Sequence, residues 1–318
     1  MNFQSIKKFT TMDKNIDLKD IITFLDNSLI AVYGEPDFVV IKHLRDPENV
    51  DEFTLDWINP LKPDKQKIAE TSKAKVIIAD KEVVFSETLK KQGKVLLVVD
   101  NPKLAIAKVG SEFFVEKPTP GIHPSAVIHP DAQIGENVFI GANSTIGKCI
   151  IENNVNIYSN VTLYDDVTVE NNAIINAGSI IGVDGLGCER DKDGKLYKFP
   201  HLGRVIIYEN VEIGANCQIA KGALSNTVIG KGTKINAGCY IAHNVVIGEN
   251  VWISPHVKIT GSVKIKDNVT IFTDCVIREQ KTIGEGATIG MGAVVTKDIP
   301  AGETWVGNPA RKLEKNKQ

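Results

Sequence analysis

Isoleucine recurs at every sixth position along most of this chain. The longest unbroken run comprises Ile229, Ile235, Ile241, Ile247, Ile253, Ile259, Ile265, Ile271, Ile277, Ile283 and Ile289. This period matches neither the 3.6-residue repeat of an amphipathic helix nor the two-residue alternation of a half-buried strand. Short strands joined by tight turns and stacked as a solenoid place every sixth side chain inward, one for each flat side of a coil. The spacing therefore predicts a parallel β-helix.

The repeat covers residues 122–307, which we assign to the solenoid domain. Glycine and asparagine gather at the intervening corners, where the backbone needs a positive φ. Two irregularities interrupt the repeat. The polar segment 184–203 leaves it and is expected to loop out, and a five-residue step occurs around Leu224. Loops on rigid scaffolds are where binding residues concentrate, so segment 184–203 is a candidate site region.

Residues 1–115 lack the repeat and predict a separate, small α/β domain. The expected elements are one short helix followed by three strands, at 17–24, 38–41, 76–78 and 95–99. A proline-rich step at 117–121 is the expected hinge into the solenoid. Residues 308–318 form the C-terminal tail. The stretch 307–312 is expected to end the coil, and the basic residues after it are expected to form a short capping helix or a frayed end.

Composition excludes several classes of function. A net charge of −2 gives no general attraction to nucleic acid or to an anionic membrane. No apolar run approaches the ~20 residues of a membrane span. The N-terminus also lacks the charged and apolar stretches of a secretory leader. We therefore expect a soluble, cytoplasmic protein with no nucleic-acid partner and no membrane span.

The cysteines predict neither a disulfide framework nor a metal site. Their number is odd, and no CxxC or Cys/His spacing typical of zinc ligands is present. We expect them to act as small apolar residues that fill turns of the solenoid: Cys149, Cys188, Cys217, Cys239 and Cys275.

Five motifs span most of the chain: the stretches at 122–128, 182–187, 199–205, 211–216 and 241–248, the last reading Ile-Ala-His-Asn-Val-Val-Ile-Gly. In their residues and in their order these motifs resemble the UDP-3-O-acylglucosamine N-acyltransferase family, which makes UDP-2,3-diacylglucosamine for lipid A. The resemblance implies a left-handed β-helix fold, acyl transfer from a thioester, and a homotrimer with active sites at subunit clefts. It also implies that the N-terminal domain binds the nucleotide base.

The chain departs from the family's pattern at several places. Ala220 stands where the family has a carboxylate, and Gln280 replaces a late histidine. The aromatic expected after Asn59-Pro60 is missing. The ending from Trp305 to Arg311 resembles coenzyme A-dependent sugar acetyltransferases instead of the family's helical extension for acyl carrier protein.

These departures favour an N-acyltransferase that uses acyl-CoA and a UDP- or dTDP-linked amino sugar, in surface-glycan synthesis. Two alternatives stay open. One is the lipid A pathway enzyme itself, with a hydroxyacyl carrier protein as donor. The other is a non-catalytic or metal-binding solenoid, although the first two hypotheses need no metal.

His243 is the candidate general base. Acyl transfer to an amine needs a proton acceptor and hydrogen-bond donors for the oxyanion, and a neutral imidazole is abundant near pH 7. The surrounding Ile-Ala-His-Asn-Val motif favours catalysis over a surface histidine. The backbone N–H near Gly261 is the candidate oxyanion donor, because glycine lets a ligand approach the main chain. A backbone carbonyl, Asn226 or Asn236 is left open as the group that orients the imidazole.

The remaining candidates bind the substrates. For the nucleotide sugar we expect sugar and diphosphate contacts in the polar segment and base contacts in the N-terminal domain, with His256 on the coil next to His243: Asp184, Gly185, Lys198, His201, His256, Trp57 and Asn59. For coenzyme A we expect a groove near the C-terminal end of the coil, with basic side chains on its phosphates: Gly290, Gly292, Lys297, Asn308, Arg311 and Lys312.

Overall fold

The computed structural model describes residues 14–314. Contacts divide the chain into two compact units, residues 1–117 and 118–318. We describe each unit by itself.

The N-terminal unit is a small α/β fold around a four-stranded sheet of order β2-β6-β5-β4. Strands β4, β5 and β6 are parallel, and β2 is antiparallel to β6. The bounds in chain order are β1 (Ile16–Asp17), α1 (Leu18–Leu25), η1 (Asp26–Ser28), β2 (Leu29–Tyr33), β3 (Val40–Ile41), β4 (Leu55–Trp57), α2 (Lys65–Thr71), β5 (Val76–Ala79), α3 (Glu87–Lys91), β6 (Val95–Val99), α4 (Pro102–Val109) and the π-helical turn η2 (Gly110–Phe114).

Local sequence explains these elements. Asp17 caps α1 by accepting a hydrogen bond from the Lys19 amide, and Asn101 caps α4 in the same way. All five side chains of β6 are buried, as a strand covered on both faces requires. Lys94 is buried as well, and its ammonium donates to the carbonyl oxygens of Ala69 and Ser72.

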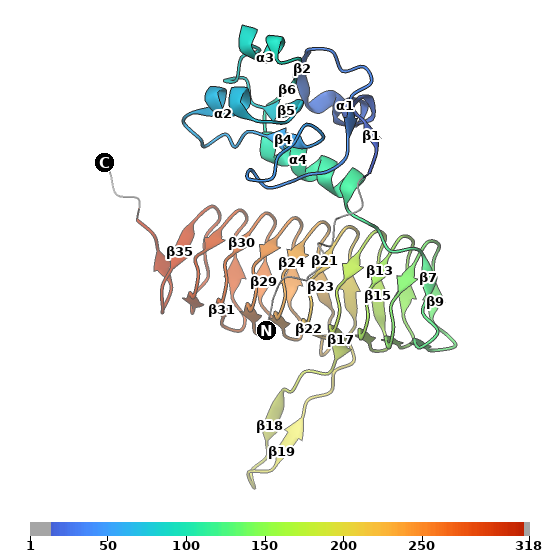
Figure 1. Cartoon of the computed structure of the whole chain (residues 1–318). Helices are drawn as coiled ribbons and strands as arrows, with labels where there is room; N and C mark the ends of the chain where they lie inside the picture. The colour runs from blue at the N-terminus through green and yellow to red at the C-terminus, as the bar shows by residue number, and fades with distance from the viewer. Residues whose placement is uncertain (1–13, 315–318) are drawn as a thin grey trace, which may run out of the picture. The chain divides into compact units, whose positions relative to one another are not determined.

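The second unit is the predicted parallel β-solenoid (Figure 1). Its short strands form three sheets, which we call the first, second and third faces and which are parallel except for the terminal strand β36. The first face contains β7 (Gly121–Ile122), β10 (Phe139–Ile140), β13 (Asn156–Ile157), β16 (Ile174–Ile175), β21 (Glu212–Ile213), β24 (Lys234–Ile235), β27 (Trp252–Ile253), β30 (Thr270–Ile271), β33 (Thr288–Ile289), β35 (Thr304–Val306) and β36 (Arg311–Lys312).

The other two faces follow the same pattern. The second contains β8 (Val127–Ile128), β11 (Thr145–Ile146), β14 (Thr162–Leu163), β17 (Ile180–Val183), β22 (Gln218–Ala220), β25 (Tyr240–Ile241), β28 (Lys258–Ile259), β31 (Val276–Ile277) and β34 (Val294–Val295). The third contains β9 (Gln133–Ile134), β12 (Ile150–Ile151), β15 (Val167–Val169), β20 (Val205–Ile207), β23 (Thr227–Ile229), β26 (Val246–Ile247), β29 (Lys264–Ile265) and β32 (Thr282–Ile283).

The six-residue register is confirmed by burial. Each isoleucine of the run from Ile229 to Ile289 is at most 2% exposed, and all of them belong to one continuous core cluster. Burying an aliphatic side chain of this size contributes about 1.5–3 kcal/mol. At the corners the backbone adopts positive φ, mostly at asparagine or glycine. The core is thus a stack of inward isoleucines linked by turns that asparagine and glycine permit.

Residues 311–312 form strand β36, which pairs antiparallel with β35 at the end of the coil. The expected capping helix or frayed end falls on the residues after Lys312, of which 315–318 lie outside the described residues. One detail differs from the expectations. Cys188 is exposed, unlike the four other cysteines, because it lies in a hairpin outside the repeat. That hairpin consists of β18 (Cys188–Arg190) and β19 (Leu196–Lys198), and Figure 1 shows it leaving the solenoid beside β17.

Both irregularities of the repeat lie at one corner. We call the turns between the second and third faces the second corner. The hairpin leaves between β17 and β20, and the step around Leu224 lies between β22 and β23, on the next coil. The coil after that turns at residues 242–245, between β25 and β26. The chain therefore departs from its repeat at the two turns that precede His243 in the stack.

Candidate active site

His243 lies at the second corner with its ring half-buried. Its Nδ1 is 2.9 Å from Oδ1 of Asn244. That amide is itself held in place, because Oδ1 accepts from the Ala223 amide at 3.1 Å and Nδ2 donates to Oγ of Ser225 at 2.6 Å. An amide oxygen only accepts, so Nδ1 carries the proton and Nε2 keeps its lone pair. The arrangement leaves Nε2 as a proton acceptor.

Asn244 is the orienting group that the sequence left open. The two asparagines considered there have other partners, since Asn226 accepts from the Arg204 amide and Asn236 accepts from the Ala237 amide. The signal for Asn244 was present in the motif, but an asparagine at a corner with φ of 61° also serves the turn itself. Its role as the hydrogen-bond acceptor for Nδ1 of His243 was therefore not apparent from the sequence.

Gly261 stacks directly on His243 from the next coil. A methyl group at Gly261 would lie 2.9 Å from Cε1 and 3.0 Å from Nε2 of the imidazole, so no larger residue fits without displacing the ring. Within residues 14–314 the Gly261 amide donates to no hydrogen-bond partner. The free N–H of Gly261 therefore belongs to the residue that packs against Nε2 of His243, the proton acceptor.

The base of the hairpin packs against the same imidazole. The rings of His201 and His243 are 5.2 Å apart between centroids and nearly perpendicular, at 79°. A methyl group at Gly185 would lie 2.5 Å from Nε2 of His201 and 2.9 Å from Cδ2 of His243. The two ends of segment 184–203 thus meet beside the candidate base, with glycine at the point of closest approach.

His201 is 5% exposed, and its two ring nitrogens differ sharply. Nδ1 is 3.0 Å from the carbonyl oxygen of Phe199 and so carries the proton. Nε2 is buried and has no hydrogen-bond partner within the described residues. Burial lowers the pKa of His201 and keeps the ring neutral near pH 7.

Two lysines hold Asp184 at the foot of the hairpin. Lys198 lies 2.6 Å from one carboxylate oxygen, and Lys221 lies 3.2 Å from the other. The hydrogen bond from Lys198, assisted by Lys221, holds the pKa of Asp184 below its usual value. Because Lys221 follows β22, the carboxylate ties the hairpin to the next coil. The sequence did not single out Lys221, which was visible only as the neighbour of Ala220.

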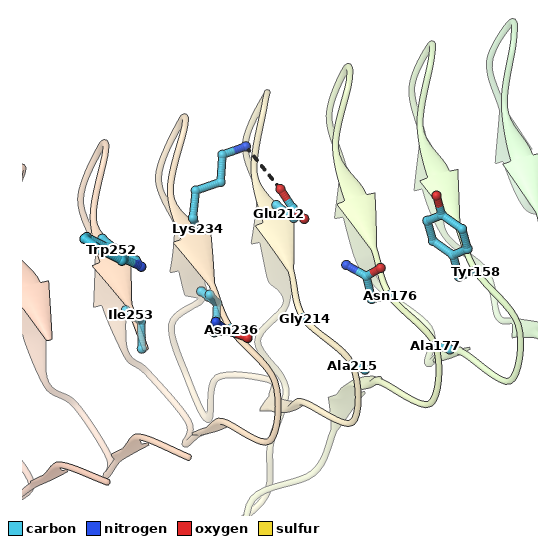
Figure 2. A pocket seen from close by; sticks show the side chains of 11 residues that line it. Tyr158, Asn176, Ala177, Glu212, Gly214, Ala215, Lys234, Asn236, Trp252 and Ile253 are labelled. Atoms are coloured by element: carbon cyan, nitrogen blue, oxygen red, sulfur yellow. Dashed lines mark ion pairs between the residues drawn. The ribbon is translucent and has the colours of Figure 1, made fainter. Parts of the chain in front are cut away.

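A groove of about 460 Å³ runs across the first face (Figure 2). It is lined by outward side chains of successive coils, among them Tyr158, Asn176 and Trp252, and by Glu212 and Lys234, which lie 3.8 Å apart. Asn236 lines this groove and not the surroundings of His243. The outward aromatic residues Tyr158 and Trp252 on one face are the sequence signal for this groove, and the six-residue period of inward residues does not contain it.

His256 is at a different corner from His243. It lies between β27 on the first face and β28 on the second, stacked on Gly238, where a methyl group would be 2.5 Å from its Nδ1. The expectation that it lies beside His243 is therefore wrong, because residues at one corner recur every 18 positions in the regular coils, as His243 and Gly261 do.

The residues predicted to bind coenzyme A fall into two groups, those that take part in the cap of the solenoid and those that are exposed. Lys312 is paired with Glu303 at 2.6 Å, and Gly290 is covered by Val306 of β35, so both take part in the cap of the solenoid. Arg311 donates to the Ala310 carbonyl oxygen. Lys297, Gly292 and Asn308 are exposed at the same end of the coil.

The N-terminal unit has a pocket of about 260 Å³ lined by Trp57 together with Asp56, Glu48 and Ser72. Trp57 is half-buried there. Asn59 is not among its lining residues, and its side-chain oxygen accepts from the Leu61 amide in a local turn. Of the two residues predicted to bind the base, Trp57 lines this pocket.

Two further observations concern residues 14–314. They contain no cluster of three or more His, Cys, Asp or Glu side chains arranged to hold a metal ion. None of the helices in this range combines the length and the apolar character needed to cross a bilayer.

Models of hexapeptide-repeat families match four stretches of the solenoid. The family described as bacterial transferase hexapeptide (six repeats) matches residues 119–148, 148–182 and 226–261. The family described as hexapeptide repeat of succinyl-transferase matches residues 282–297. These matches confirm the repeat that the isoleucine spacing predicts.

Curated relatives confirm the resemblance stated from the motifs. A UDP-3-O-acylglucosamine N-acyltransferase from Coxiella burnetii is 54% identical over 69 residues, and one from Idiomarina loihiensis is 55% identical over 69 residues. Each match covers 22% of this chain and 20% of the relative. The chain thus spans about a fifth of the length of the curated relatives that it matches.

Two solved structures confirm the fold. A UDP-N-acetylglucosamine acyltransferase from Bacteroides fragilis superposes with a TM-score of 0.55 and 26% identity, over 61% of this chain and 74% of that one. The Arabidopsis UDP-N-acetylglucosamine acyltransferase gives a TM-score of 0.51 and 27% identity, over 62% and 74%. The names of the curated relatives favour the lipid A pathway hypothesis over our first one, the acyl-CoA-dependent enzyme of surface-glycan synthesis.

Proposed function

We propose that this chain is an N-acyltransferase that moves an acyl group from a thioester to the amine of a UDP-linked amino sugar. The observation that carries the proposal is His243, whose Nε2 lone pair lies beside the unpartnered amide of Gly261. Following the names of the curated relatives, UDP-3-O-acylglucosamine is the first acceptor to test. A dTDP-linked amino sugar is the second.

In the proposed reaction His243 acts as base and then as acid. The acceptor amine attacks the thioester carbonyl carbon, a C–N bond forms, and the amine proton passes to Nε2 of His243. The carbonyl electron pair moves to oxygen, where the Gly261 N–H stabilises the negative charge. Collapse breaks the C–S bond, and the leaving thiolate takes the proton from His243. A positioned base contributes about 10²–10⁴-fold, and one oxyanion donor about 10²–10³-fold.

Asn244 holds the imidazole in the tautomer that this cycle needs. Its oxygen accepts the Nδ1 proton at 2.9 Å, so the other nitrogen faces the acceptor without a proton. When the ring becomes an imidazolium, the same oxygen stays hydrogen-bonded to Nδ1–H. We therefore describe Asn244 as a positioning residue.

The sugar nucleotide has candidate contacts in each unit. Near His243, Lys198 and Lys221 bring two positive charges to one carboxylate, Asp184, which leaves an excess cation for a diphosphate. In the N-terminal unit, the pocket beside Trp57 is the candidate site for the nucleotide base.

The donor is proposed as an acyl thioester of either acyl carrier protein or coenzyme A. The family that the motifs resemble uses acyl carrier protein, so a hydroxyacyl carrier protein is the first donor to test. Lys297 and Arg311 remain the candidate contacts for coenzyme A phosphates, whereas Lys312 is already neutralised by Glu303. Substituting Lys297 and Arg311 together by alanine should raise KM for acyl-CoA and leave KM for acyl carrier protein unchanged.

We also propose that the chain acts as a homotrimer. A solenoid exposes broad faces that repeat proteins bury by assembly, and the resemblance implies threefold symmetry. Light scattering after gel filtration should give three times the 34.7 kDa chain mass. A monomer at micromolar concentration would refute this part of the proposal.

Mass spectrometry of the nucleotide sugar tests the function directly. The protein is incubated with UDP-3-O-acylglucosamine, or with a dTDP-linked amino sugar, and with each donor in turn. We expect the mass of one acyl group to be added to the amine, and His243→Ala to form about 10²–10⁴-fold less product in the same time. Absence of product with every pair would overturn the proposal and favour a non-catalytic solenoid.

A further inference from the structure

Within residues 14–314 the buried lone pair of His201 Nε2 has no hydrogen-bond partner. Its Nδ1–H is committed to the Phe199 carbonyl oxygen at 3.0 Å, which fixes the tautomer and leaves Nε2 as an acceptor. Nε2 is buried, and nothing within residues 14–314 donates to it. A buried acceptor without a hydrogen bond is unfavourable, because it has lost its bond to water and gained none in return. Such an atom calls for a ligand that brings a hydrogen-bond donor.

The position of this lone pair connects it with the candidate base. The two imidazoles pack edge to face with 5.2 Å between centroids. The Gly185 main chain touches both, since one methyl group there would contact Nε2 of His201 and Cδ2 of His243 together. Nε2 of His201 therefore faces Gly185 directly, and the atom of His243 that faces Gly185 is Cδ2, which is bonded to the acceptor Nε2.

An amine and a hydroxyl differ in how many donors they bring to the two Nε2 atoms. A neutral amine carries two N–H groups, and a hydroxyl carries one O–H. One donor is taken by Nε2 of His243, which removes that proton during the reaction. Only the amine has a second donor, which can satisfy Nε2 of His201. A hydroxyl acceptor would leave the buried lone pair unpaired.

We propose that His201 is a specificity-determining residue that selects an amine over a hydroxyl as the acyl acceptor. The inference rests on the proposed acyl transfer and deepens it. Gly185 covers the lone pair until the acceptor enters, so its peptide shifts when the amine binds, and water is kept from satisfying Nε2 beforehand. A site built to hydrogen-bond one group discriminates strongly against an analogue that lacks it.

The test compares two acceptors that differ only in the reacting group. One is UDP-3-O-acylglucosamine, and the other is the same nucleotide sugar with a hydroxyl at that carbon. We expect His201→Phe, which has no acceptor atom, to lower kcat/KM for the amine about 10- to 100-fold and to leave the hydroxyl substrate unchanged. His201→Gln, whose amide oxygen accepts, should recover part of the preference.

The outcomes distinguish a failure of the proposed function from a failure of the proposed role of His201. If the wild-type protein acylates neither acceptor, the proposed function and this inference both fall. If the wild type acylates the amine and His201→Phe lowers kcat/KM equally for both acceptors, only the role of His201 is refuted. Circular dichroism and thermal unfolding of the variant show whether it is folded.

A measurement on the wild-type protein avoids any dependence on that variant. The ¹⁵N chemical shift of His201 Nε2 should be that of an unprotonated nitrogen without a hydrogen bond. It should move toward hydrogen-bonded values on adding the amine acceptor without donor, and not on adding the hydroxyl analogue. Equal changes with both acceptors, or none with the amine, would overturn the inference.

Discussion

The coils from β24 to β34 and the coils from β17 to β23 share one core and differ in their corners. In the first group every turn follows the repeat, and each inward isoleucine is buried. In the second group the chain inserts a hairpin, shifts register between Ile181 and Val183, and takes a five-residue step. The regular coils supply a rigid frame, whereas the interrupted coils bring groups that no repeat would place beside His243.

The difference shows how a repetitive fold acquires chemistry. In a regular coil each corner residue meets only the residues above and below it, as His256 meets Gly238. At the second corner His243 meets Gly261 above and the returning ends of a 20-residue excursion beside it. Convergence of polar groups therefore depends on breaking the repeat at the same corner on neighbouring coils.

The sharpest test removes the base and compares it with a histidine at a regular corner. We expect His243→Ala to lower kcat about 10²–10⁴-fold without changing the unfolding temperature. His256→Asn keeps a residue suited to the positive φ of that corner and should change kcat less than about twofold. Steady-state kinetics measure kcat for both variants. Equal losses of kcat would contradict the assignment of the active site to the second corner.

A core substitution should have the opposite profile. Ile271→Ala in β30, where the side chain is fully buried, should lower the free energy of unfolding by about 2–5 kcal/mol and leave kcat unchanged in the folded protein. The neighbouring outward residue offers a control, since Thr270→Ala should stay within about 0.5 kcal/mol. Denaturant unfolding measures the free energy of unfolding of both variants. A large loss of kcat in folded Ile271→Ala would contradict the separation of the core from the candidate active site.

Two glycines of the excursion form a matched pair. An alanine at Gly185 would press on both imidazoles, and we expect about 10- to 100-fold loss of kcat/KM from their displacement. An alanine at Gly187 would meet only Cβ of Phe199, at 3.7 Å, and should be neutral. If the two variants have the same kinetics, the hairpin base does not position the histidines.

Asn244 and Asn268 are both corner asparagines with positive φ, at different corners. Asn244→Gly keeps the backbone conformation but removes the acceptor for Nδ1–H of His243, so we expect about a tenfold or greater loss of kcat. Asn268→Gly should leave kcat unchanged. A wild-type rate for Asn244→Gly would show that another group fixes the tautomer.

The smallest expected effect is a loosening of the hairpin in acid. The pKa of Asp184 is lowered in the folded chain by Lys198 and then Lys221, so its ion pairs stabilise the hairpin above the unfolded value of 3.8. The stabilisation is lost as pH falls through the folded pKa. Hydrogen exchange should therefore rise in 184–203 before it rises in the regular coils, and Asp184→Asn should remove this difference.

The sequence predicts the solenoid fold far better than the arrangement of the candidate active site. Burial of Ile235 or Ile271 follows from a local period, because every coil repeats the same contacts. The position of His201 beside His243 depends on where a long excursion returns, which no local pattern contains. Strand β36 was not predicted for the same reason, since it exists through its pairing with β35. Asn244 was overlooked because a corner asparagine already has a conformational explanation.

The excursion leaves after β17 and returns to β20, and both strands keep their parallel neighbours in the stack. Its two points of attachment are thus fixed by coils that do not depend on what lies between them. The intervening segment can therefore be lengthened, shortened or exchanged, by evolution or by design, without a change in the solenoid fold. A lineage of such proteins can acquire new acceptors by editing one insertion while inheriting the same column of isoleucines.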